Sequence, residues 1–187
     1  LAKFSAGTSI VSGSNSYGGQ TLINGGTLVA QGGSAITDTS VVTIALGATL
    51  QIDSDETIGS LVGAGNVGLG SNTLTTGVNN TDTTFTGVIS GSGGLEKAGT
   101  GIFTLTGGHT YTGLTTVSNG RLQLGTGGTI AGDIHVVDNG LGWFDFVQSG
   151  SYTYSGVLSG GQISQSGAGT TTLTGANRNE YVRTNLC

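Results

Sequence analysis

The densest group of chemically active side chains in this sequence is acidic: Asp53, Asp55 and Glu56. Carboxylate oxygens are preferred ligands of Ca²⁺, and a calcium site of this kind could support cleavage of a polysaccharide. Such cleavage also needs a cation beside the cluster, and Arg121 is the one candidate clear of the chain ends and of the repeat linker. No spacing places Arg121 near the cluster. We therefore expect a solvated corner, with a polysaccharide-acting enzyme as the alternative.

The two histidines are the next candidates for catalysis. His109 stands where a similar stretch of the chain has Asn15, so we interpret it as a corner residue. His135 alternates with Ile134 and Val136, which predicts a place on the outer side of a strand. Neither histidine has a nucleophile or carboxylate at a motif spacing, and no G-x-S-x-G elbow is present. The sequence predicts no catalytic residues and no enzyme.

Cofactor motifs are weak or absent. Residues 63–68 match G-x-G-x-x-G, but a Gly-rich strand pattern follows them, whereas a dinucleotide site needs a helix there. Cys187 is the sole cysteine, so neither a zinc motif nor an intrachain disulfide can form. We expect no cofactor and no metal site.

Aromatic residues concentrate near the end of the chain, where they could stack on sugar rings or anchor a protein partner. The candidate binding patch comprises Trp143, Phe144, Tyr152 and Tyr154. Alternation divides the first run, with Trp143 and Asp145 on one side and Phe144 and Phe146 on the other. The favoured interpretation is an aromatic ladder in the core, and the alternative is a binding patch.

Composition limits which elements could position these residues. Of 187 residues, 38 are Gly, none is Pro or Met, and only 8% are charged, which excludes a helical bundle. Net charge is −5 with five Lys and Arg, so no basic patch can neutralise a nucleic acid. A Gly-rich, Thr-rich all-β chain remains.

The chain repeats itself. Residues 15–28 align without gaps on residues 109–122, and both read Y-x-G-x-T-x-[IV]-x-x-G-x-L. A second pair aligns residues 85–107 with residues 154–175. Glycine recurs at matching places, such as Gly19 and Gly113, which is typical of corners where coils stack.

Short β-favouring runs separated by Gly, Asn, Ser and Asp predict the strands. They are residues 21–23, 41–46, 49–52, 102–106, 115–117, 122–124, 134–137, 143–147, 152–154 and 170–174. With about 20 to 25 residues per coil, the repeats favour an all-β, right-handed parallel β-helix (β-solenoid) of about eight coils. Thr-x-Thr pairs beginning at residues 73, 84, 104 and 172 leave an ice- or glycan-binding solenoid as a further alternative.

Residues 58–77, 84–107 and 111–124 closely resemble the autotransporter-associated β-strand repeat of Gram-negative passenger domains, and the match continues through residues 129–134 and 154–177. The resemblance implies a right-handed parallel β-helix. It also implies an extracellular segment of type V secretion, exported through a C-terminal outer-membrane barrel that this chain lacks. Membrane attachment is expected only through that barrel.

We divide the chain into β-helical passenger repeats, residues 1–177, and an atypical tail, residues 178–187, which reads as truncated or frame-shifted. The predicted function is a non-enzymatic, surface-exposed or secreted stalk, or an adhesin-like segment. Its host or surface ligand, protein or glycan, is not identified by the sequence. Uncapped coils also predict end-to-end self-association.

Overall fold

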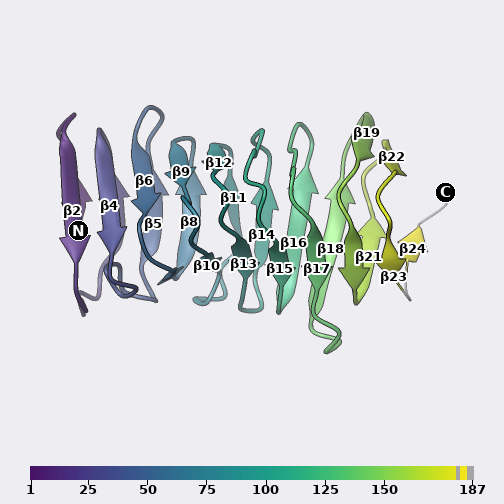
Figure 1. Ribbon diagram of the computed structural model, residues 1–187, viewed down its shortest axis with the longest axis horizontal. Helices are drawn as coiled ribbons and strands as arrows, with labels where there is room; N and C mark the ends of the chain where they lie inside the picture. The colour runs from purple at the N-terminus through teal and green to yellow at the C-terminus, as the bar shows by residue number, and fades with distance from the viewer. Residues whose placement is uncertain (180–181, 185–187) are drawn as a thin grey trace.

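The computed structural model describes residues 1–179 and 182–184 and consists of strands joined by short turns, without a helix in those residues. The chain winds in one direction, and its turns stand side by side from the N-terminus to the C-terminus (Figure 1). Every strand pair is parallel, as in the pairing of β3 (Thr21–Ile23) with β5 (Val41–Ile44). No helix in these residues is long and apolar enough to cross a membrane.

Each turn passes from a ten-stranded sheet to a second face, and from the turn of β5 onward it then passes through a seven-stranded sheet. The ten-stranded sheet contains β1 (Ala2–Lys3), β3, β5, β8 (Ser60–Gly63), β11 (Thr83–Phe85), β14 (Ile102–Leu105), β16 (Gly120–Gly125), β18 (Gly142–Val147), β21 (Gln162–Gln165) and β24 (Val182–Thr184). The seven-stranded sheet contains β7 (Glu56–Ile58), β10 (Leu74–Thr76), β13 (Leu95–Lys97), β15 (Thr115–Val117), β17 (Ile134–Val136), β20 (Leu158–Gly160) and β23 (Arg178–Asn179).

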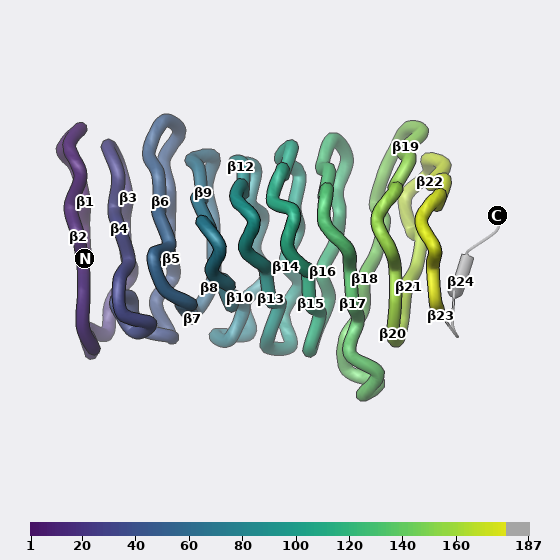
Figure 2. Tube along the Cα trace, viewed as in Figure 1, coloured from purple at the N-terminus to yellow at the C-terminus, as the bar shows by residue number. Residues whose placement is uncertain are grey.

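The second face is interrupted along the rod. Its five-stranded sheet contains β2 (Thr8–Ser12), β4 (Thr27–Gln31), β6 (Thr49–Ile52), β9 (Asn66–Gly68) and β12 (Val88–Ser90), and its two-stranded sheet contains β19 (Ser151–Tyr154) and β22 (Thr170–Leu173). Between the two sheets this face has only a bridge from Gly108 to Thr129 in the described residues. The tube in Figure 2 shows the turns evenly stacked, with the longer connection after β17 projecting beyond its neighbours.

The predicted parallel β-solenoid is confirmed, with about nine turns rather than about eight. One turn takes 20 residues between paired Ala2 and Leu22, and 22 between paired Leu124 and Phe146. At about 4.8 Å per strand, nine steps make a rod about 40 Å long. β23 and β24 belong to the expected tail and continue two of the sheets, so the ladder passes residue 177.

All ten predicted strands are present: three have the predicted bounds, and the other seven are shortened or extended by no more than two residues at an end. The additional strands include β8 and β9, which contain Gly and Asn, residue types that are uncommon in strands. They form because strands of the turns before and after supply ladder partners to their backbone.

Inward-facing side chains stack from turn to turn to make one continuous core. In the ten-stranded sheet Phe85 pairs with Leu105, which pairs with Leu124 and then Phe146, and all four are buried. Fully burying such a side chain stabilises the fold by about 1.5–3 kcal/mol. The predicted inward leucine of the Thr-x-Thr strands is confirmed at Leu105, which has no exposed surface.

The sequence repeats do not fall on equivalent faces. Residues 21–23 lie in the ten-stranded sheet as β3, whereas their counterparts, residues 115–117, lie in the seven-stranded sheet as β15. Phe85 and its counterpart Tyr154 are similarly divided between β11 and β19. The repeat therefore specifies a strand-corner-strand unit rather than a place on the cross-section.

Candidate functional site

The predicted aromatic patch is split between the core and the surface. The inward positions of β18 and β19 bury Phe144 and Tyr154, and the Tyr154 hydroxyl donates to the Gly132 carbonyl at 2.6 Å. Tyr152 is half-buried, with its ring 6.0 Å from that of Phe146. Trp143 is half-buried on the opposite side of β18. The four side chains therefore do not form one surface patch.

The core ladder that was the favoured interpretation is present instead. Phe144 and Phe146 meet edge to face with ring centroids 4.8 Å apart, and Phe146 lies 6.0 Å from Tyr154. Aromatic pairs in this arrangement contribute about 0.5–1.5 kcal/mol beyond the area they bury.

On the outer side of the ten-stranded sheet, Trp143 belongs to a polar cluster. The Arg121 guanidinium lies 5.4 Å from the centroid of the Trp143 ring and 3.4 Å from an oxygen of Asp145. Asp145 is wholly buried although it faces outward, because four side chains cover it and donate to it: Arg121, Gln123, Ser164 and Ser166, at 2.6 to 3.4 Å. The cluster joins β16, β18 and the turn that begins with β21.

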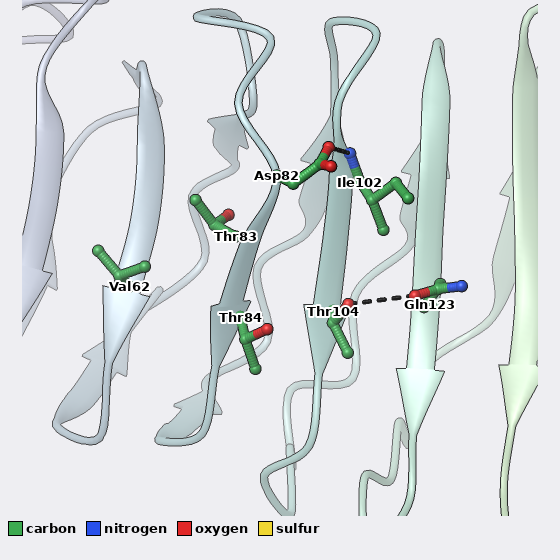
Figure 3. A pocket seen from close by; sticks show the side chains of 7 residues that line it. All are labelled: Val62, Asp82, Thr83, Thr84, Ile102, Thr104 and Gln123. Carbon is green, nitrogen blue, oxygen red and sulfur yellow. Dashed lines mark hydrogen bonds between the residues drawn. The ribbon is translucent and has the colours of Figure 1, made fainter.

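Beside this cluster the same face carries an open groove of about 450 Å³. It crosses β8, β11, β14 and β16 and is lined by Val62, Asp82, Thr83, Thr84, Ile102, Thr104 and Gln123. Figure 3 shows Thr84, Thr104 and Gln123 projecting from neighbouring strands, with Thr104 bonded to Gln123. In the ladder Thr84 pairs with Thr104, and Thr104 pairs with Gln123 on the next turn. The row of threonines that the ice-binding alternative would require therefore stops at Gln123.

The acidic cluster of Asp53, Asp55 and Glu56 is also divided between the surface and the core. Asp53 and Asp55 are exposed, as expected for a solvated corner, but Glu56 is 2% exposed and faces inward. Its carboxylate accepts hydrogen bonds from the backbone N–H groups of Ala35 and Ile36, at 3.2 and 2.7 Å. Burial raises the pKa of Glu56, and these two bonds partly offset the rise. The solvated-corner prediction is therefore wrong for Glu56, because the turn before it supplies donors.

No three His, Cys, Asp or Glu side chains converge on a point where a metal ion could bind, as far as the described residues show. Asp55 instead accepts from the Thr73 N–H at 2.7 Å, and Asp53 accepts from Gln51 at 3.3 Å.

The two histidines differ. His135 lies on the outer side of β17, as predicted, with Nδ1 3.0 Å from the Ser159 hydroxyl. His109 is at a corner but is buried, between the rings of Phe85 and Tyr111 at 6.2 and 6.4 Å. Its Nδ1 accepts from the Ile89 N–H, while its buried Nε2 has no partner. Burial lowers the pKa of His109 to about 4, so the ring is neutral at pH 7.

Sequence reasoning missed a set of buried amino and amide groups. Lys97 has no exposed surface, and its ammonium donates to the carbonyls of Ala98, Gly99 and Asn119 at 2.6, 2.8 and 3.3 Å. Lys3 contacts the carbonyls of Ser5 and Gly25 in the corresponding way. The signal was available, because the 94-residue offset between Asn15 and His109 also carries Lys3 onto Lys97.

A second recurring contact explains the Y-x-G-x-T motif. The Tyr111 and Thr115 hydroxyls are 2.6 Å apart in the core, and those of Tyr17 and Thr21 are 2.9 Å apart. Each pair closes one corner of the coil and leads into a strand. The motif therefore describes a corner with an internal hydrogen bond.

Comparison with known proteins agrees with these recurring corners. Residues 1–30, 95–124 and 163–181 match the family model of the passenger-associated-transport repeat. The chain is 40% identical over 142 residues to the adhesin BmaC autotransporter of Brucella suis biovar 1 (strain 1330). That alignment covers 70% of this chain and 4% of the relative, so the chain spans a small part of the relative's length. No solved structure matches the chain.

The repeat matches coincide with the structural units. The first two matched segments begin at the buried Lys3 and Lys97 corners and include the Tyr17 and Tyr111 hydrogen bonds. The third includes Gln165, whose amide donates to the Gly167 and Gly169 carbonyls at 3.2 and 3.0 Å. With the stacked parallel coils and the adhesin relative, these matches show that the chain is an autotransporter passenger repeat region.

Proposed function

We propose that this chain is a non-enzymatic, adhesin-like stalk segment, exposed on the bacterial surface as part of an autotransporter passenger. The observation that carries the proposal is how the buried polar side chains are used. Lys97 bonds to the Asn119 carbonyl, His109 to the Ile89 N–H and Glu56 to the Ile36 N–H, each across one turn. Groups that could take part in catalysis are thus engaged in joining successive coils.

The stacked architecture suits such a role. Each coil contacts mainly the coils before and after it, so additional coils lengthen the rod without a new core design. The Thr, Ser, Asn and Gln side chains on the outer faces keep this surface polar with only 8% charged residues. A rod of this kind would hold adhesive elements away from the cell.

The stalk role is tested by removing whole turns from the parent passenger in its own bacterium. Deleting residues 3–43, which lie outside the lining of the groove, removes two turns and puts Ile44 in the place of Lys3, because Lys3, Ile23 and Ile44 are successive ladder partners. Whole-cell antibody labelling measures display, and adhesion is measured on the same cells. We expect both to persist. Normal display with lost adhesion would contradict the stalk role and show that the deleted turns themselves carry the adhesion.

The non-enzymatic part is tested on the purified chain. Acidic and neutral polysaccharides are incubated with it, with and without Ca²⁺, and new reducing or unsaturated ends are counted. We expect none. Calcium-dependent cleavage that disappears in Asp53→Ala/Asp55→Ala would overturn this part of the proposal.

A further inference from the structure

We infer that the groove on the outer side of the ten-stranded sheet binds a linear, uncharged oligosaccharide. The groove spans four adjacent strands along the rod, and Figure 3 shows its side chains rising from these strands in succession. It is open to solvent, so a chain-like ligand can enter without any movement of the backbone. This inference does not rest on the stalk role, because a stalk without the binding site would have the same fold.

The lining has the chemistry that recognises sugars. Thr83, Thr84 and Thr104 each offer a hydroxyl that donates and accepts, and each also carries a methyl group. Val62 and Ile102 add apolar surface. A sugar ring has the matching combination of hydroxyl groups and C–H surfaces, so hydrogen bonds and apolar contacts can form together.

The polar groups are held in position before any ligand binds. The Ile102 N–H donates to one oxygen of Asp82 at 2.7 Å, which fixes the carboxylate at the edge of the groove. Thr104 donates to Gln123 at 3.3 Å, and Gln123 donates to Asp145 at 3.4 Å. Groups already ordered by such bonds lose little conformational freedom on binding.

The charge of the groove favours an uncharged ligand. Asp82 is the charged residue of its lining, and it would repel sulfate or carboxylate groups on a sugar. The nearest cation along the same row, Arg121, is paired with Asp145 and lies over Trp143. The chain as a whole carries a net charge of −5.

The position of the groove argues against a peptide as the occupant. A bound peptide strand needs the free N–H and C=O groups of a sheet edge, whereas here the groove lies on the face of strands paired on both sides. A docked helix needs a broad apolar surface, and the lining has two aliphatic residues, Val62 and Ile102. In contrast, neighbouring strands about 4.8 Å apart present polar side chains at a spacing close to one sugar ring.

The test uses the ¹⁵N-labelled 187-residue chain and three uncharged probes: the hexasaccharides of β-1,4-glucan, chitin and β-1,4-mannan. A heparin hexasaccharide is the anionic comparison. We expect at least one uncharged probe to shift the amide signals of β11, β14 and β16 selectively, with no matching shift from heparin. Binding of heparin alone, or no selective shift from any uncharged probe at millimolar concentration, would overturn the inference.

Variants locate the site. Thr104→Ala and Gln123→Ala each remove hydrogen-bonding groups, and we expect about tenfold weaker binding from each. Thr116→Ala is the matched control, because Thr116 lies on the outer side of β15, in the seven-stranded sheet and away from the groove lining. Thermal unfolding of each variant verifies the fold. Equal affinity in all three variants would place the binding elsewhere and contradict the inference.

Discussion

Corners of the coil are held by side-chain nitrogen donors at three places: the buried Lys3 and Lys97 and the half-buried Gln165. At Lys97 and Gln165 the side chain donates to the carbonyl two residues ahead, Gly99 and Gly167. Backbone carbonyls at a corner point away from the sheet ladders, and leaving one buried without a donor costs about 1–3 kcal/mol. The positive charge is therefore dispensable here, and the donor is required.

Substitutions of Lys97 distinguish the role of its positive charge from the role of its hydrogen-bond donor. Lys97→Gln, which copies Gln165, should change the free energy of unfolding by less than about 1 kcal/mol, whereas Lys97→Met should lower it by about 2–4 kcal/mol. Denaturant unfolding at pH 7 measures both, and equal losses would contradict the donor role.

Lys97 also makes the stability of the fold depend on pH, and Lys97→Gln tests this dependence. Burial lowers the pKa of Lys97 to about 8, although Asp82 partly offsets this, while the unfolded lysine titrates near 10.5. Between these values the unfolded chain binds more protons, so the native protein should gain stability as pH rises from 8 to 10.5. Lys97→Gln should lose this gain.

His109 makes the stability of the fold depend on pH in the acidic range. Its pKa is lowered to about 4 by burial, against 6.5 in the unfolded chain. Between pH 6.5 and 4 the unfolded state binds the extra proton, so acidification should destabilise the fold by about 3 kcal/mol at most. His109→Asn should abolish this loss, because an asparagine does not titrate. The fold should tolerate the change, since Asn177, at the corresponding place, accepts a hydrogen bond from the Leu158 N–H at 2.9 Å.

His135→Asn is the matched control for His109→Asn, because His135 is only half-buried. Glu56 has a raised pKa and therefore acts in the opposite direction, but it is present in every variant and cancels in the comparison. Identical acid transitions for His109→Asn and the unmodified chain would contradict the prediction.

At the scale of the element, glycine stacks decide how closely the corners approach. A Cβ on Gly113 would collide with the Gly93 carbonyl oxygen, and one on Gly132 would collide with that of Gly113. Gly120 and Gly26, matched in the repeat, both have a positive φ, 65° and 64°. Gly19 is different, since nothing lies within 4 Å of the place its Cβ would take.

The pair Gly113 and Gly19 is a direct test, because the repeat aligns them. Gly113→Ala should lower the free energy of unfolding by about 3 kcal/mol or more, since backbone atoms must shift. Gly19→Ala should be neutral, or stabilising by up to about 1 kcal/mol through the unfolded state. Denaturant unfolding of the 187-residue chain measures both, and similar costs would show that packing is not the reason for glycine at Gly113.

For the whole molecule, the unit of stability is one complete turn. Phe85 and Leu105 are ladder partners 20 residues apart, so any deletion that joins two such partners keeps every later strand in register. A deletion that is not a full turn places strands against corners. It also removes the N–H and C=O groups with which the neighbouring turns must pair.

Deleting residues 85–104 from the purified chain should therefore leave a folded rod one turn shorter. Its far-UV circular dichroism should remain that of a β protein, and its unfolding should remain cooperative at lower stability. Deleting only residues 85–94 should abolish cooperative unfolding, because ten residues are half a turn. The reverse order of stability would contradict the one-turn unit.

The sequence by itself determined the local structure of this protein. Alternation in runs such as residues 102–106, and Gly or Asn at the turns between runs, depends on neighbours along the chain, so strands and corners could be predicted. The repeated Y-x-G-x-T segments at Tyr17 and Tyr111 also predicted stacked coils. For the candidate site, alternation correctly placed Trp143 and Asp145 on one side of their strand.

Only the tertiary structure decided which polar groups are buried and which face each repeat occupies. Glu56, Lys97 and Asp145 are buried because partners about one turn away cover and bond them, and no local pattern reports on residues about 20 positions distant. The groove has the same origin, since β8, β11, β14 and β16 become neighbours only when coils stack. In a solenoid, burial is a property of adjacent turns rather than of adjacent residues.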